Sequence, residues 1–367
     1  MLYRLAFSSL RGLNVSLAEE ILLRLSGEEE FFTMPSVALR SLMGFRSRLF
    51  DDEVRARALA EAREEEKFVV RNDISPLYFR DCSYPSRLRE CEDAPVMLYS
   101  YGDCRLDDAY VIGIVGTRHS TVFGENFVAD LVAGLKAQLD GRLVVVSGLA
   151  YGIDACAHKV ALDNGVATVG VLAHGLNTIY PAAHRELAAR MVREGGALVT
   201  EYRSSDAIHK GNFLARNRIV AGLCDCLLVV ESDVRGGALV TARIASDYSR
   251  DVFALPGRVS DRYSRGCNQL IASNVAQLVS SASDIIDHMR WPRRAEEGSQ
   301  TSLFDTEPEL NEVESAVIDT IRRKGEANMN EIMACVDLPM PRLMGMLVDL
   351  EFRNLIVAIP GARYRVR

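Results

Sequence analysis

Three short loops carry the residues best suited to bind phosphate, and each lies between an apolar segment and a helical pattern. Glycine allows a ligand to approach the backbone closely, and the free N–H groups at a helix start favour an anion. An arginine can bind a phosphate through two parallel N–H groups, although a surface arginine paired with an acid is the alternative at Arg118. The loops predict a cleft for a phosphate-bearing ligand, and their residues are Gly116, Thr117 and Arg118, then Ser147 and Gly148, then Gly236 and Gly237.

A second feature is the basic stretch 203–218, in a chain whose formal net charge is −7. Its only acid is Asp206. An aromatic ring among cations suits single-stranded nucleic acid, because cations follow the phosphates while a base stacks on the ring. The alternative is that Phe213 belongs to the core and the arginines are structural, since successive helix residues point about 100° apart. The candidate residues of this stretch are Lys210, Phe213, Arg216, Asn217 and Arg218.

The chain lacks the common signatures of nucleotide cofactors. Gly113 and Gly116 are separated by two residues, so no G-x-G-x-x-G follows the strand pattern there. No Gly-Lys-Ser/Thr follows a strand pattern either, so a P-loop is absent. We therefore expect no cofactor.

The titratable residues also give no catalytic or metal-binding pattern. Asp154 opens a helical pattern and fits a cap or a residue that fixes the loop. Glu201 and Glu231, which end strand patterns, fit structural roles better than catalysis. The histidines share no metal-ligand spacing, and Cys224 and Cys226 fit reduced, buried thiols better than a zinc site. We expect no catalytic residue and no metal, hence a protein that is not an enzyme.

Composition places the chain among globular proteins. It has 367 residues, 48% hydrophobic and 25% charged, which is too long for one ordinary core and indicates two or three domains. No apolar run approaches the ~20 residues of a membrane span, and the polar start MLYRLAFSSLRGL does not fit a signal peptide. We expect a cytoplasmic protein without a membrane partner. The negative net charge argues against a protein that coats DNA over its whole surface.

The elements that must position these loops are parallel strands. Runs of Val, Ile and Leu alternate with helical patterns from Val111 onward, which is typical of a parallel sheet covered on both faces. The fold class is therefore α/β, a Rossmann-like, doubly wound and mostly parallel sheet, in a domain spanning 68–290. Ligands of such sheets lie at the carboxyl ends of the strands, where all three loops fall. A short strand is also predicted at 68–72, and one continuous helix from Phe213 to Cys224.

Two helical regions flank this domain. Residues 1–67 predict a helical bundle similar to sterile-alpha-motif or helix-hairpin-helix domains, with a DNA-backbone role or simple packing as alternatives. Residues 291–308 predict a linker, and 309–367 predict a winged helix from three helical patterns and a terminal hairpin. The third helix carries Arg342 and Arg353 beside Asp349 and Glu351, a small charge for reading DNA. Protein contact fits that helix at least as well.

The chain resembles the DNA processing protein A family (DprA/Smf) through motifs that occur in order between about residues 77 and 288. They are GIVGTR with FGE, VVVSGLAYGIDACAH, TVGVLAHGLNTIYP, GALVTEY, NFLARNRIVAGL, LVVES with GGALVTARIA, and VFALPG with GCNQLIAS. The resemblance implies a non-enzymatic homodimer that binds and protects incoming single-stranded DNA and loads RecA during natural transformation.

The resemblance also implies roles for single residues. Arg118 would contact phosphate, Lys210 would supply a cation, and Phe213 would supply a stacking or wedging ring. Asn217 and its flanking arginines, Arg216 and Arg218, would complete the pocket. Backbone and hydroxyl donors would come from Gly116, Thr117, Ser147 and Gly148.

Two departures from the family pattern leave alternatives open. Leu214 stands where the family often has proline, and Gly236-Gly237-Ala238-Leu239 stands where it often has Ser-Gly-Ser-Leu. One alternative is a nucleotide-processing enzyme of the phosphoribohydrolase type, whose glycine-rich loop is superficially similar. However, the glutamate which that loop requires is missing between Ala238 and Ala245. The other alternative is a nucleotide-sensing scaffold on a related sheet.

Overall fold

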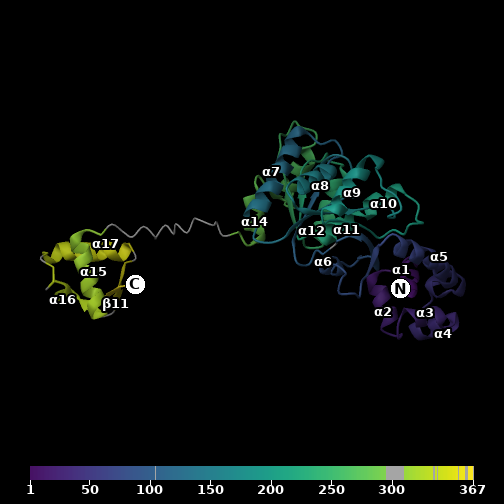
Figure 1. Ribbon diagram of the computed structural model, residues 1–367, viewed down its shortest axis with the longest axis horizontal. Coiled ribbons are helices and arrows are strands. Elements are labelled where there is room, and N and C mark those ends of the chain that lie inside the picture. Colours follow the sequence, from purple (N-terminus) through teal and green to yellow (C-terminus); the bar gives the residue numbers. More distant parts are fainter. Residues whose placement is uncertain are drawn as a thin grey trace. The chain divides into compact units, whose positions relative to one another are not determined.

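The computed structural model describes residues 1–103, 105–294, 310–333, 335–336, 338–353, 355–359 and 363–366. The chain divides into two compact units, Met1–Arg294 and Ala295–Arg367 (Figure 1). Most of the predicted linker, 291–308, falls among residues 295–309, which lie outside the described residues.

The larger unit is built on one nine-stranded sheet in the order β1-β2-β6-β5-β4-β3-β7-β8-β9. From β6 to β9 all neighbouring strands are parallel, whereas β2 runs antiparallel to β6 and β1 antiparallel to β2. The predicted mostly parallel sheet is therefore confirmed. The strands are β1 Ser75–Tyr78, β2 Met97–Gly102, β3 Tyr110–Val115, β4 Leu143–Ser147, β5 Ala167–Val171, β6 Ala197–Thr200, β7 Cys226–Val229, β8 Asp251–Ala254 and β9 Gln277–Leu278.

Helices cover both faces of this sheet because side chains along each strand alternate between two cores (Figure 1). In β3, Val111 and Val115 join one core with α11 and α12, whereas Ile112 and Ile114 join the other with α7, α8 and α14. The helices are α6 Ser86–Arg89, α7 Val122–Gln138, α8 Ile153–Asp163, α9 Arg185–Arg193, α10 Lys210–Ala215, α11 Asn217–Leu223, α12 Gly237–Asp247, α13 Arg265–Ala272 and α14 Ala282–Met289.

The strand order reverses at β3. Strands β4, β5 and β6 extend from one side of β3, and β7, β8 and β9 extend from the other. At such a switch point the loops after the two adjacent strands diverge and leave a crevice at the carboxyl edge of the sheet. The loops in question follow β3 and β7, and they contain Arg118 and Gly236.

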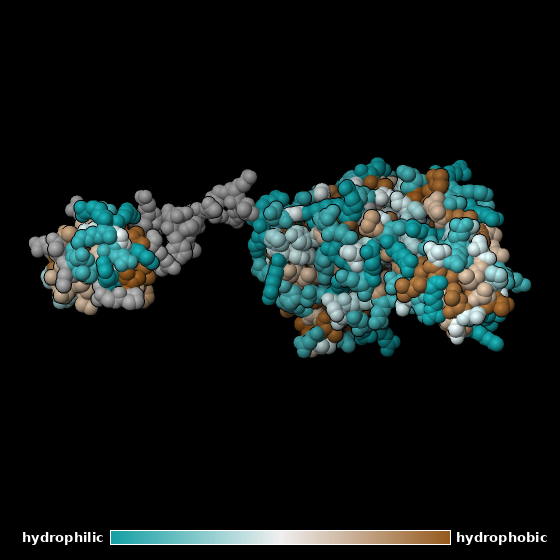
Figure 2. Space-filling view, turned by 90° about the horizontal axis from the view of Figure 1, so that it is seen from below, coloured by the Kyte–Doolittle hydropathy of each residue, from teal (hydrophilic) through white to brown (hydrophobic). Residues whose placement is uncertain are grey.

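The N-terminal part of this unit consists of five α-helices: α1 Leu2–Ser8, α2 Val15–Leu22, α3 Glu28–Thr33, α4 Ser36–Met43 and α5 Asp52–Arg71. Helix α5 continues through Arg71, so the strand predicted at 68–72 is wrong and the predicted boundary after residue 67 falls inside a helix. Val69 is buried in the continuous core while Val70 is 67% exposed, which helical periodicity explains. Figure 2 shows hydrophobic surface gathered over these helices, where Leu23 and Val37 are exposed.

The single helix predicted from Phe213 to Cys224 is instead two short helices. Helix α10 ends at Ala215 and α11 begins at Asn217, with Arg216 in a turn between them. Arg216 keeps helical backbone angles, with φ −59° and ψ −28°. Arg216 and Arg218 therefore point to different sides of the chain, as residues two apart in a helix do.

The smaller unit has its own core. It contains α15 Glu312–Lys324, α16 Met329–Met333 and α17 Met340–Phe352, with a three-stranded sheet of β10 Ala327–Asn328, β12 Arg363–Val366 and β11 Ile356–Ile359. Leu343, Leu347 and Leu350 of α17 are buried. The opposite side of α17 exposes Met344 and Phe352.

Among the described residues, no helix combines the length and the apolar content needed to cross a membrane.

Candidate functional site

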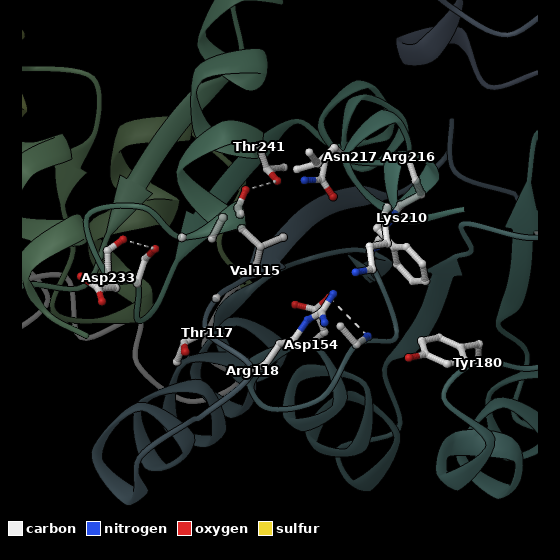
Figure 3. Close-up of a pocket in the computed structure, with 18 residues that line it drawn as sticks. Val115, Thr117, Arg118, Asp154, Tyr180, Lys210, Arg216, Asn217, Asp233 and Thr241 are labelled. Atoms are coloured by element: carbon white, nitrogen blue, oxygen red, sulfur yellow. Dashed lines mark hydrogen bonds between the residues drawn. The ribbon is translucent and has the colours of Figure 1, made fainter. Parts of the chain in front are cut away.

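A cavity of about 520 Å³ opens at the switch point of the sheet (Figure 3). It is bounded by the loop after β3, the start of α8, the loop after β7 with the start of α12, and the residues around α10. We call it the switch-point cavity. Its lining includes seven residues from the predicted site: Gly116, Thr117, Arg118, Lys210, Phe213, Arg216 and Asn217.

Arg118 is exposed at the wall formed by the loop after β3. Its guanidinium carbon lies 6.0 Å from the centre of the Phe213 ring, at the outer limit of a cation–π contact. Within the described chain it makes no ion pair, so the alternative of a surface pair with an acid is not what the structure has. The side chain is available to an anion in the cavity.

The opposite wall is formed by α10, which supplies a cation and an aromatic ring. Lys210 is exposed and has no ion-pair partner among the residues that the structure describes. Phe213 is half-buried, and its ring centre lies 5.6 Å from that of Tyr180 in an edge-to-face arrangement. The alternative prediction, that Phe213 belongs to the core, is therefore wrong, because Phe213 lines the cavity.

Tyr180 is a site residue that the sequence reasoning missed. It is 51% exposed and comes from the long loop after β5. The ring of buried His174 fixes this loop, because Nδ1 faces the Gly175 carbonyl at 2.9 Å and Nε2 accepts from the Tyr180 amide at 3.1 Å. The sequence did contain a signal for Tyr180. It is an aromatic residue with a polar hydroxyl, in a loop that follows a parallel strand at the same edge of the sheet as the other loops.

Arg216 forms the floor of the cavity and is an unusual buried cation. It is 6% exposed, and its Nε has no hydrogen-bond partner. Burial lowers the pKa of Arg216, and the nearby Asp154 carboxylate opposes that shift. Burial likewise raises the pKa of Asp154 in spite of Arg216. The guanidinium, which remains protonated at neutral pH, therefore has unused donor capacity beside the cavity.

Three residues of the predicted site lie elsewhere. Ser147 is fully buried and its hydroxyl donates to the Ile114 carbonyl at 2.6 Å. Gly148 lies beneath Arg216 and is not part of the cavity wall. Arg218 faces away from the cavity and pairs with Glu201 at 2.5 Å. The structure thus brings seven of the ten predicted residues to the cavity wall, and Ser147, Gly148 and Arg218 are not part of the lining.

The acidic side chains near the cavity form ion pairs or hydrogen bonds with other parts of the chain. Asp233 pairs with Arg262 at 2.7 Å, and Asp154 accepts from the Ala150 amide at 3.4 Å. Glu231 accepts from the amide of Thr121 at 2.8 Å and from its hydroxyl at 2.5 Å, which holds the start of α7. These carboxylates have structural partners, as expected for Glu231. Asp154 fixes the loop before α8 and does not cap this helix, whose N-cap is Gly152.

Cysteine and histidine side chains do not assemble a metal site in the described ranges, where no three potential ligands of the His, Cys, Asp and Glu types converge. Cys224 and Cys226 belong to the cores on opposite faces of the sheet, so the two thiols cannot share one ion. Burial raises the pKa of Cys224 to about 12, which keeps the thiol protonated.

Sequence comparison identifies relatives of this chain. The family model of DNA recombination-mediator protein A matches residues 75–290. A putative DNA processing protein DprA of Mycobacterium tuberculosis is 37% identical over 290 residues, which cover 77% of this chain and 71% of the relative. Protein Smf of Escherichia coli is 34% identical over 295 residues, covering 77% of this chain and 75% of the relative.

Solved structures agree with these matches. The X-ray structure of DNA processing protein A from Streptococcus pneumoniae aligns with a TM-score of 0.65 and 32% identity, over 78% of this chain and 97% of that one. A structure described as showing the single-stranded DNA binding mode of DNA processing protein A from Helicobacter pylori aligns with a TM-score of 0.52 and 29% identity. That alignment covers 59% of this chain and 95% of the other.

Proposed function

This chain belongs to the DNA recombination-mediator protein A family, and from that premise we propose that it binds single-stranded DNA in the switch-point cavity. One observation carries the proposal. Arg118, Lys210 and Arg216 surround a single cavity without an ion-pair partner in the described chain, although the protein as a whole is acidic. The Helicobacter pylori relative, described as binding single-stranded DNA, supports the choice of ligand.

Each wall of the cavity has a distinct role in this proposal. Arg118 and Lys210 contact phosphates from opposite sides, and a base stacks on the Phe213 ring, which Tyr180 supports from its edge. Thr117 contributes its hydroxyl, because its amide already donates to the Glu231 carbonyl at 2.6 Å. Gly116 and Asn217 complete the walls between these groups.

The buried members of the predicted site act indirectly in this proposal. The Ser147 hydroxyl donates to the Ile114 carbonyl and so fixes the end of β4. Gly148 leaves room for Arg216, which in turn places positive charge beneath the bound phosphates. Arg218 holds Glu201 and so fixes the start of α11 against the sheet.

We extend the proposal to the role that the family resemblance implies. The protein protects single-stranded DNA and loads RecA onto it, as a cytoplasmic homodimer and without catalysis of its own. In the domain plan that we propose, an N-terminal helical domain and an extended Rossmann-like domain share the first unit. The second unit is a winged helix after the linker.

We do not place the DNA site in the second unit. Arg353, directly after helix α17, pairs with Glu314 at 3.0 Å and with Asp349 at 3.3 Å, and Arg342 is the arginine within that helix. The exposed side of α17 carries Met344 and Phe352, which have no affinity for phosphate. Single-strand binding is accordingly assigned to the first unit.

A binding titration tests the proposal. Fluorescence anisotropy with a labelled single strand and a duplex of equal length, at several salt concentrations, should show a preference for the single strand and affinity that falls with salt. Arg118→Ala should weaken binding about tenfold, the effect of one charge-assisted contact, and should reduce the salt slope by about 0.7. Arg243→Ala, an exposed arginine of α12 outside the cavity, is the matched control.

Three outcomes contradict the proposal. Equal affinity of Arg118→Ala and the unaltered protein removes the cavity from the DNA site. Thermal stabilisation by a nucleoside monophosphate without any by an oligonucleotide favours the nucleotide-sensing alternative, and release of a free base from that nucleotide favours the enzyme alternative.

A further inference from the structure

The loop after β8 gathers arginines beside the switch-point cavity. This loop, 255–264, and the first residue of α13 together hold three exposed arginines. A fourth exposed arginine lies in the loop after β7, the parallel neighbour of β8 at the same edge of the sheet. We call these four arginines and the aromatic ring among them the β8-loop surface, and its residues are Arg235, Arg258, Arg262, Tyr263 and Arg265.

Direct contacts join this surface to the cavity. Ser232 and Asp233 line the cavity. The Ser232 amide donates to the Tyr263 carbonyl at 2.6 Å, and Asp233 pairs with Arg262 at 2.7 Å. The exposed ring of His119, in the loop after β3, stacks on the Tyr263 ring with the two centres 6.3 Å apart. The β8-loop surface therefore begins where the cavity ends.

Hydrogen bonds hold the loop after β8 in shape. The Asn268 side chain donates to the Gly257 carbonyl at 2.9 Å and accepts from the Gly257 amide at 3.2 Å. Two turns follow, in which the Asp261 amide donates to the Arg258 carbonyl at 3.0 Å and the Ser264 amide donates to the Asp261 carbonyl at 3.1 Å. The arginines thus extend from a backbone whose conformation is fixed before any ligand arrives.

The charge balance of these loops is positive. The loops after β3, β7 and β8, each taken up to the first residue of the next helix, carry five arginines and three acids, in a chain whose formal net charge is −7. The charged residues are Arg118, Arg235, Arg258, Arg262 and Arg265, with Glu231, Asp233 and Asp261. Glu125, in the first turn of α7, accepts from the Ser120 hydroxyl at 2.6 Å, and counting it leaves the balance positive.

The positive charge is also available to a ligand. Within the described ranges, Arg262 is the member of the β8-loop surface that has an ion-pair partner. Arg235, Arg258 and Arg265 are exposed and make no ion pair there. Of the acids, Glu231 is buried and accepts from Thr121. Three cations therefore face solvent beside the cavity with their charges uncompensated by a direct partner.

This charge distribution distinguishes two paths for a strand that leaves the cavity. A cavity of about 520 Å³ matches pockets that enclose one small molecule, whereas folds that bind single strands cover about 4–16 nucleotides. A larger cavity, of about 980 Å³, is bordered by Asn212 of α10, but four arginines and four acids line it and give it no net charge. The β8-loop surface is positive and adjoins the switch-point cavity, so it is the more favourable path for phosphates.

We propose that the β8-loop surface is a second segment of the single-strand site, in which Arg235, Arg258 and Arg265 contact phosphates of a strand that leaves the switch-point cavity past the loop after β7. Exposed His119, supported by the Tyr263 ring, offers a face on which a base stacks. The inference rests on the proposed function and extends the ligand surface to the loop after β8. Arginine contacts to phosphates carry no sequence information, so this segment lengthens the footprint and does not select bases.

The test compares two double variants that remove equal charge. Arg258→Ala/Arg265→Ala removes two unpaired cations of the β8-loop surface, and Arg63→Ala/Arg71→Ala removes two exposed arginines of α5 as the control. Affinity for an oligothymidylate of about 20 nucleotides is measured by anisotropy over a range of salt concentrations. The loop variant should bind about tenfold more weakly, because each exposed ion pair changes binding by about two- to fivefold. Its salt slope should fall by about 1.4, from two lost phosphate contacts.

The control variant should change affinity by less than about twofold and leave the salt slope as it is, because α5 lies outside the proposed path. Equal thermal midpoints should show that both variants fold. An unchanged salt slope in the loop variant overturns the inference, as does an equal loss in the two variants, which would reflect overall charge. Failure of the proposed function is a different result, because the unaltered protein would then not bind the oligonucleotide and Arg118→Ala would have no effect.

Discussion

The guanidinium of Arg216 occupies the space beside Gly148 in which any other residue would place its Cβ atom. A Cβ built on Gly148 would lie 1.4 Å from Nη1 of Arg216, 2.2 Å from Cζ and 2.4 Å from Nη2, all far closer than van der Waals contact. The side chain that fills this space is 6% exposed and carries a charge. The glycine after β4 is therefore required by the floor of the cavity, where a buried cation lies directly against the backbone.

Gly148→Ala should expel Arg216 from its position. The atoms in the way are the end of the buried Arg216 side chain, so relief requires movement of that side chain or of the backbone, at a cost of about 1–3 kcal/mol. For a unit of this size that cost lowers the melting temperature by about 3–10 °C, and affinity for single strands should fall with it. Scanning calorimetry measures the melting temperature, and fluorescence anisotropy measures the affinity for single strands.

The matched control is Gly211→Ala in α10, where a Cβ meets no atom within 4 Å. It should leave the melting temperature unchanged or raise it slightly, since alanine favours a helix. A Gly148→Ala protein as stable as the unaltered one would show that the space beside this glycine is not restrictive.

The sheet and its loops could be predicted because their signals are local. Runs such as Val111–Val115 alternate with helical patterns, and parallel strands bring the loops that follow them to one edge. Gly116 and Arg118 were found in this way, and the cavity lies where they were expected. The sequence alone was sufficient for this level of the fold.

The directions of Arg216 and Arg218 could not be predicted. Leu214, Ala215 and Asn217 surround Arg216 without a glycine or proline, so nothing local indicates the break between α10 and α11. Arg216 is buried because its guanidinium fills the space beside Gly148, a contact between distant segments that no local pattern indicates. Tyr180 was missed for a related reason, because its place at the cavity depends on packing between distant segments.

Phe213→Ala and Tyr180→Ala should separate stacking from charge. Loss of a ring that stacks on a base costs about 1–3 kcal/mol, so Phe213→Ala should weaken binding about 5- to 150-fold at constant salt. Tyr180→Ala should have a smaller effect, because this ring supports Phe213 from its edge. The salt slope should remain that of the unaltered protein in both variants, since no phosphate contact is lost.

Anisotropy across salt concentrations distinguishes the two contributions, and Phe213→Leu is the control that keeps apolar volume without the aromatic face. If Phe213→Leu binds as tightly as the unaltered protein, Phe213 acts by packing and the stacking role is wrong.

Buried His158 should make the fold sensitive to acid. The Thr168 hydroxyl donates to the Val145 carbonyl at 2.8 Å, so it accepts from Nδ1 of His158 at 2.7 Å, and Nε2 is left buried without a partner. Burial, reinforced by the charge of Arg216, lowers the pKa of His158 to about 3. The unfolded chain takes up a proton near pH 6.5. Between these values only the unfolded state binds it, so stability falls as pH falls.

The expected loss between pH 7.5 and 5 is about 2 kcal/mol, from about 1.4 kcal/mol for each unit below the unfolded pKa. His158→Asn retains a donor for Thr168 but cannot titrate, so its melting temperature should be lower at pH 7.5 and should change less on going to pH 5. His209→Asn, at an exposed position, should keep the full change. A His158→Asn protein that loses as many degrees as the unaltered one would assign the acid sensitivity to other groups.

Glu65→Gln should loosen the N-terminal helices from the sheet. The Glu65 carboxylate is buried and accepts from both donors of Ser204, so a glutamine leaves one of these donors opposite an NH₂ group. An unsatisfied buried group costs about 1–3 kcal/mol. Because Glu61 and Arg203 hold the same junction, the effect should be local. Amide hydrogen exchange should increase in α5 and in residues 201–206 while the exchange in β3 and β4 stays slow.

Glu64→Gln is the adjacent control, because this exposed residue pairs only with exposed Lys67 among the described residues. If α5 is equally protected in Glu65→Gln and Glu64→Gln, apolar packing around Val69 and Ala62 is enough to hold the helices in place.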